Sequence, residues 1–170
     1  IEGGNITGVN SFMELKYRES NLKHTLKMVK LSKLKYKLVG NVNKSFMGDV
    51  DIAVTWRDML KIIKTDKENF WIDLDKFFKN KPVKHYKVQK GLGQISLVVP
   101  MVDGNKKIQS RISDRRGTLD TKEDAMVQID IMVGNVDWMK KSFTPSEDSK
   151  YKSVYKNIFL ADILGQLIFK

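Results

Sequence analysis

The fold is decided by the stretch 37–54, which reads KLVGNVNKSFMGDVDIAV. Apolar, β-forming residues surround Asp49 and Asp51, which is typical of a strand, and a preceding strand ends at the glycine turn of Gly40. Side chains alternate between the two faces of a strand, so the two carboxylates share one face. The other face then belongs to three apolar residues, Val50, Ile52 and Val54.

A third acid, Asp130, lies in the similar stretch 127–133, which reads VQIDIMV. Three carboxylates at strand positions repel one another unless a cation lies between them. The pattern therefore predicts a Mg²⁺ or Mn²⁺ site for handling phosphates, with Asp49, Asp51 and Asp130 as ligands. Pairing of these acids with arginine or lysine is the structural alternative, because an Asp-x-Asp motif is common by chance.

Composition narrows the class of protein. The chain has 170 residues, enough for one domain with a real core, and 41% of them are hydrophobic. The lack of cysteine excludes a disulfide scaffold and a thiolate zinc site, and it fits a reducing compartment, so we expect a cytoplasmic protein. No apolar run approaches the ~20 residues of a membrane span. The chain does not begin with methionine and stops in an apolar helical pattern, so we expect a single domain, 1–170, cut from a longer chain. Further chain or a partner would cover its last helix.

The chain is strongly basic, with a net charge of +11. The first 48 residues contain 9 basic and 3 acidic groups, so the excess is densest there. A basic field attracts polyanions, which favours a nucleic-acid partner. The alternative is a soluble, lysine-rich surface, and the small share of arginine weakens the case for specific phosphate recognition.

Periodicity predicts a mixed α/β protein with a mixed β-sheet flanked by helices. The expected helices cover 11–32, 57–64, 66–79, 135–142 and 151–169, and the expected strands cover 34–39, 49–55, 83–88, 95–102, 106–112 and 125–133. Ser11 is the expected N-cap of the first helix, and Thr65 and Glu68 form a capping box for the third. An exposed loop is expected over 113–117.

The stretches 38–41 and 48–52, together with Asp130, resemble the DNA polymerase β-like nucleotidyltransferase superfamily. The match covers 36–54 and 127–133 directly, and the order of elements extends it loosely over most of the chain. The resemblance implies a nucleotidyltransferase-like core that moves a nucleoside monophosphate from an NTP to an acceptor hydroxyl with two Mg²⁺ ions. It also implies that Asp49 and Asp51 hold both ions, while Asp130 holds the catalytic-side ion and helps to deprotonate the acceptor.

In that superfamily the glycine turn holds the triphosphate, which makes Gly40, Asn41, Lys44 and Ser45 the expected NTP-binding residues. The sequence departs from the family pattern at Asn41, where serine or glycine is usual. Asparagine tolerates a turn and can donate through its amide. Basic residues that could neutralise the pyrophosphate are Lys44, Arg111, Arg115, Arg116, Lys150 and Lys152.

RNA or DNA is the expected acceptor, and a small hydroxyl compound or a protein is possible. Two other functions stay open. One is an inactive relative that binds nucleic acid or a partner protein. The other is a glycosyltransferase that binds a nucleotide-sugar through Mn²⁺, which is the weaker idea because its acids usually end a strand, whereas Asp49 begins one.

Overall fold

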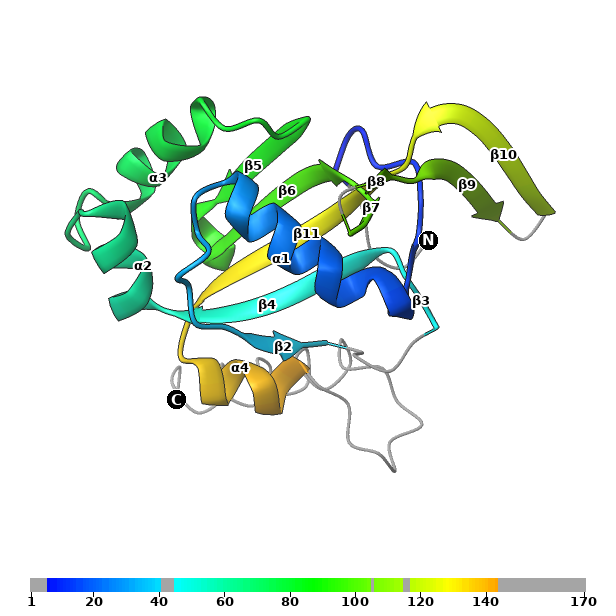
Figure 1. The fold of residues 1–170 in the computed structure, drawn as a ribbon. Helices are drawn as coiled ribbons and strands as arrows, with labels where there is room; N and C mark the ends of the chain where they lie inside the picture. The colour runs from blue at the N-terminus through cyan, green and yellow to red at the C-terminus, as the bar shows by residue number, and fades with distance from the viewer. Residues whose placement is uncertain (1–5, 41–44, 105, 115–116, 144–170) are drawn as a thin grey trace.

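The computed structural model describes residues 6–40, 45–104, 106–114 and 117–143. It confirms a mixed α/β fold built around a five-stranded mixed sheet (Figure 1). Across the sheet the strands are β2 Lys37–Val39, β4 Asp49–Thr55, β11 Met126–Gly134, β6 Gln94–Pro100 and β5 His85–Gln89. β4 and β11 are parallel, and the other neighbours are antiparallel.

One face of the sheet is apolar and carries the main core. Its side chains come from alternate positions of the strands and include Ile52, Ile95 and Ile131, all 0% exposed. Three helices cover this face: α1 Arg18–Met28, α2 Trp56–Ile63 and α3 Phe70–Lys79. Their buried side chains, such as Leu22, join the strand residues in one hydrophobic cluster. The apolar half of each strand pattern therefore specifies where the helices pack.

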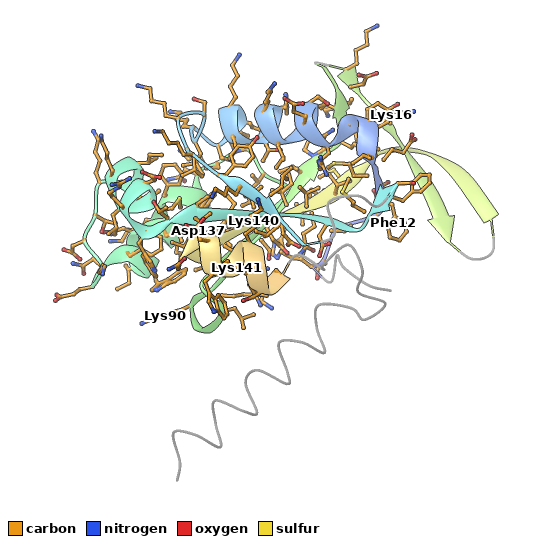
Figure 2. The ribbon with its side chains drawn as sticks, turned by 90° about the horizontal axis from the view of Figure 1, so that it is seen from below. Phe12, Lys16, Lys90, Asp137, Lys140 and Lys141 are labelled. Carbon is orange, nitrogen blue, oxygen red and sulfur yellow. The ribbon has the colours of Figure 1, made fainter. Side chains whose placement is uncertain are left out.

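The opposite face is polar in its middle and apolar at one corner. Val39 of β2 and Ala53 of β4 are buried there against Met139 of α4 Val136–Phe143. Lys37 on β2 and Asp137 on α4 add an ion pair, with Nζ and Oδ1 2.8 Å apart. Figure 2 shows the outer side of α4, with Asp137, Lys140 and Lys141 at the surface.

The predicted N-terminal helix over 11–32 is wrong in its bounds. Before α1 the chain forms β1 Met13–Glu14, paired with β3 Phe46–Met47, and a 3₁₀ turn over Leu15–Tyr17. Ser11 is not an N-cap, because α1 begins at Arg18 with Tyr17 as its N-cap, and the Ser11 backbone N–H donates to the Met126 carbonyl at 3.2 Å. Lys30, with φ 63°, takes the left-handed conformation just after α1. Long-range strand pairing thus overrides the helical pattern.

The predicted capping box at the start of α3 is also wrong. Thr65 Oγ1 donates to Asp73 Oδ2 at 2.7 Å, and it is Asp66 Oδ1 that accepts from the backbone N–H of Asn69, at 2.8 Å. The helix accordingly begins at Phe70, several residues later than expected. Asp66 instead stabilises the turn before the helix.

The predicted loop at 113–117 is mostly strand. β9 Gln109–Asp114 and β10 Gly117–Asp124 form an antiparallel hairpin that projects from the body of the molecule (Figure 1). The smaller elements are β7 Val102–Asp103, β8 Lys106–Lys107 and a 3₁₀ turn over Lys90–Leu92. The predicted helix at 151–169 lies outside the described residues. Within the described ranges, each helix is too short or too polar to cross a bilayer.

Candidate metal centre

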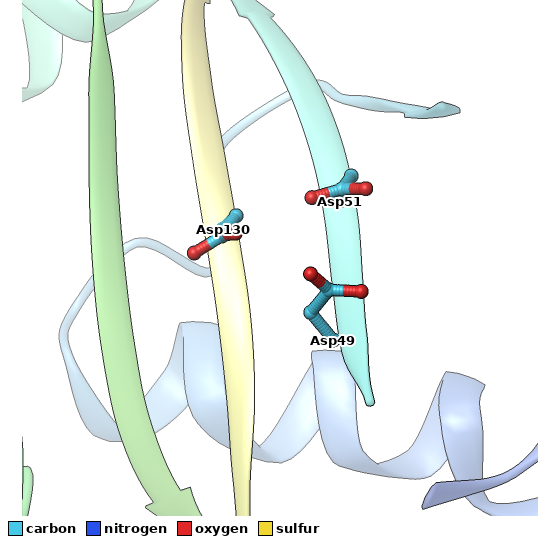
Figure 3. Close-up of side chains that lie close together, drawn as sticks. All are labelled: Asp49, Asp51 and Asp130. Carbon is cyan, nitrogen blue, oxygen red and sulfur yellow. The ribbon is translucent and has the colours of Figure 1, made fainter. Parts of the chain in front are cut away.

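The two acidic strands are neighbours in the sheet. β4 and β11 run parallel, and their register places Asp51 directly opposite Asp130, with Asp49 opposite Gln128. Directly opposed residues point to the same face, and adjacent strands lie about 4.8 Å apart. One carboxylate oxygen from each of Asp49, Asp51 and Asp130 lies within 4.8 Å of the other two. Figure 3 shows the three side chains converging over the two strands.

Burial makes this cluster electrostatically costly. The pKa of Asp51 rises from 3.8 to about 8, first because the carboxyl is buried and then because Asp49 and Asp130 are close. Burial and the charge of Asp49 likewise raise the pKa of Asp130. A divalent cation would remove this repulsion, and carboxylate oxygens are the ligands that Mg²⁺ and Mn²⁺ prefer. The residues present therefore fit the predicted metal, and their role as ligands remains a prediction.

Gly40 lies against the same cluster. It has φ +76°, which favours glycine, and a Cβ atom built at this position would lie 2.8 Å from Asp51 Oδ2. A side chain at residue 40 would therefore strain the backbone and displace the Asp51 carboxylate. The structure thus adds a second reason for this glycine, besides the close approach of a phosphate expected from the sequence.

Asp130 has polar partners that sequence reasoning missed. Gln128 Nε2 donates to both of its carboxylate oxygens, at 3.0 and 2.9 Å. Ser96, opposite Asp130 on β6, and Gln94 also form hydrogen bonds that lower the pKa of Asp130 and partly offset its burial. Gln128 was detectable in principle, because it lies two positions before Asp130 and so shares its strand face. The β6 partners follow only from the antiparallel register.

The other expected site residues are only partly placed. Ser45 is exposed, and its carbonyl accepts the backbone N–H of Leu15 at 3.0 Å. Asn41 and Lys44 lie outside the described residues, as do Arg115, Arg116, Lys150 and Lys152. Arg111 is on β9, away from the five-stranded sheet.

The basic residues divide between the two sides of the sheet. α1 packs on the apolar face, opposite the carboxylates, so its exposed lysines lie on the far side from the acidic cluster. One of them, Lys23, pairs with Glu19 at 2.6 Å.

On the carboxylate side, α4 presents Lys140 and Lys141 at the surface (Figure 2), and β5 presents Lys87 in the row that contains Ser96 and Asp130. The exposed lysines of α1 are therefore separated from the acidic cluster by the sheet, whereas Lys37 of β2 shares its face with the cluster.

The arrangement can hold a hard divalent cation beside Gly40 on the polar face of the sheet. No protein-family model matches this chain, and no curated protein matches it.

Proposed function

We propose that this protein is a metal-dependent nucleotidyltransferase that uses an NTP and an acceptor hydroxyl. The observation that supports this most strongly is the convergence of Asp49, Asp51 and Asp130 from two parallel strands within 4.8 Å. The glycine turn at Gly40, directly beside Asp51, adds a place where backbone can approach a phosphate. This combination matches the resemblance found in the sequence and gives a role to all three acids.

The proposed reaction is an in-line displacement at the α-phosphorus of the NTP. The acceptor oxygen forms a new bond to that phosphorus while the bond to the bridging oxygen of the β-phosphate breaks, releasing pyrophosphate. Asp49, Asp51 and Asp130 would hold Mg²⁺ or Mn²⁺, which when bound neutralises the charge of the phosphates. Asp130 would orient the acceptor hydroxyl and accept its proton, and its burial favours the protonated carboxyl that results.

The direct test is incubation of the protein with labelled NTPs and Mg²⁺ or Mn²⁺, with and without RNA, DNA or small hydroxyl acceptors. We expect labelled acceptor and stoichiometric pyrophosphate from the wild type and neither from Asp51→Asn. Asp75→Asn is the matched control, because Asp75 is exposed on α3, which packs on the other face of the sheet. Label in none of these acceptors would argue against catalysis and favour an inactive relative.

Metal binding can be measured separately from catalysis. A ligand present at 100 times its Kd stabilises the folded state by about 2.7 kcal/mol, so Mg²⁺ or Mn²⁺ should raise the melting temperature clearly. Asp51→Asn should abolish that increase, while Asp75→Asn should keep it. A wild-type melting temperature that did not respond to either ion would contradict the metal centre itself.

A further inference from the structure

Gln128 is a buried amide placed directly against one proposed metal ligand. It lies on β11 two residues before Asp130, so both side chains occupy the same face of the sheet, and it is 6% exposed. Its Nε2 atom lies 3.0 Å from Oδ1 and 2.9 Å from Oδ2 of Asp130. An amide NH₂ group has two N–H donors, so it can serve both oxygens at once.

The orientation of this amide is fixed from its other end. The backbone N–H of Ile6 donates to Gln128 Oε1 at 3.3 Å. A backbone N–H can only donate, and an ionised carboxylate can only accept. Only one orientation of the amide therefore satisfies both neighbours, with its oxygen toward Ile6 and its nitrogen toward Asp130.

Ile6 is held in place by the segment that follows it. The backbone N–H groups of Asn10 and Ser11 donate to the Met126 carbonyl at 3.1 and 3.2 Å, and Asn10 Oδ1 accepts the Met126 N–H at 2.7 Å. Gly8 lies against Val98, where an added Cβ would be 3.7 Å from Cγ1. Residues 6–11 are thus bonded to the first residue of β11, and through Gln128 they reach the acidic cluster.

We propose that Gln128 is a positioning residue for the metal centre, and that the Ile6 backbone N–H orients it. In this arrangement the amide holds the Asp130 carboxylate in the rotamer that faces Asp49 and Asp51. This inference rests on the proposed metal-dependent function, because it assigns Gln128 a role at that same site. When a residue that is hydrogen-bonded to a metal ligand is removed, the affinity for the metal typically falls about 10- to 100-fold.

The test is the affinity for Mn²⁺, measured by calorimetry in the absence of nucleotide. We expect Gln128→Leu to weaken Mn²⁺ binding about 10-fold or more. Asn21→Leu is the matched control, because Asn21 is a buried amide on α1, which packs on the opposite face of the sheet from Asp130. It should bind Mn²⁺ like the wild type. The melting temperature of each metal-free variant separates a loss of fold from a loss of positioning.

A second pair of variants leaves Gln128 itself in place. Ile6→Pro removes the backbone N–H that donates to Gln128, whereas Ile6→Ala keeps it. We expect weaker Mn²⁺ binding for Ile6→Pro than for Ile6→Ala. Wild-type Mn²⁺ affinity in both Gln128→Leu and Ile6→Pro, with binding lost in Asp51→Asn, would overturn this inference alone. Absence of Mn²⁺ binding by the wild type would overturn the proposed function as well.

Discussion

The acidic cluster should make the metal-free protein less stable as the pH rises, and replacement of Asp51 should reverse this. The pKa of Asp51 rises from 3.8 to about 8 in the folded protein. Below pH 4 the carboxyl is protonated in both the folded and the unfolded state. Above that pH the unfolded state releases its proton first, so the free energy of unfolding falls until the folded state ionises near pH 8. Asparagine cannot ionise and resembles the protonated form.

The size of the effect follows from the pKa shift. Each pKa unit corresponds to about 1.4 kcal/mol, so the three units between pH 5 and pH 8 give at most about 4 kcal/mol. Asp49 and Asp130 contribute to the shift of Asp51, so this free energy belongs to the cluster as a whole and not to Asp51 alone. We therefore expect Asp51→Asn to stabilise the metal-free protein, relative to wild type, by about 2–4 kcal/mol more at pH 8 than at pH 5.

Urea denaturation in EDTA at a series of pH values measures this difference directly. Asp73→Asn is the control, because hydrogen bonds from Thr65 and Lys76 lower the pKa of Asp73, whereas the pKa of Asp51 is raised. The Asp73 carboxylate stabilises the folded state at pH values above its pKa in the unfolded state. This stabilisation is lost as the pH falls through its pKa in the folded state. A stability difference between Asp51→Asn and wild type that did not change from pH 5 to pH 8 would refute the electrostatic account of the cluster.

Two further predictions concern stability. Gly40→Ala should destabilise the protein more than Gly104→Ala in urea denaturation: both glycines have positive φ, at +76° and +60°, but only at Gly40 does the new Cβ meet another atom, Asp51 Oδ2 at 2.8 Å. The left-handed conformation alone costs roughly 1–2 kcal/mol, so equal losses would show that the contact with Asp51 is unimportant. Asn21→Leu should lower stability by about 1–3 kcal/mol, because buried backbone groups lose their partners. Asn21 donates to the Val102 carbonyl and accepts the Val102 N–H, both at 2.8 Å, and an unchanged denaturation midpoint would contradict this.

The alternation of residue types within the strands was enough to predict the polar and apolar faces of the sheet. Asp49 and Asp51 share one face while Ile52 is buried on the other, because a period of two is a local property of the chain. The β4 strand, read as 49–55, has those bounds in the structure. The mixed α/β class likewise followed from local periodicity.

Local sequence patterns predicted secondary structure less well where a segment pairs with residues far away in the chain. The helix expected over 11–32 loses its first residues to pairing of β1 with β3 and to bonds with Met126. A single helical pattern cannot reveal these partners, because they depend on residues far away in the sequence. The same applies to α1 and its lysines, whose position on the far side of the sheet from the carboxylates depends on packing.

By itself, the sequence determined which acids could act together: three carboxylates on apolar strands, and a glycine turn before two of them. The tertiary structure decided that β4 and β11 are neighbours in parallel register, which puts Asp51 opposite Asp130. It also decided that Gln128 donates to Asp130 and accepts the backbone N–H of Ile6. The physical reason is that strand alternation is set by local backbone geometry, whereas register and hydrogen-bond partners are set by the packing of segments far apart in the chain.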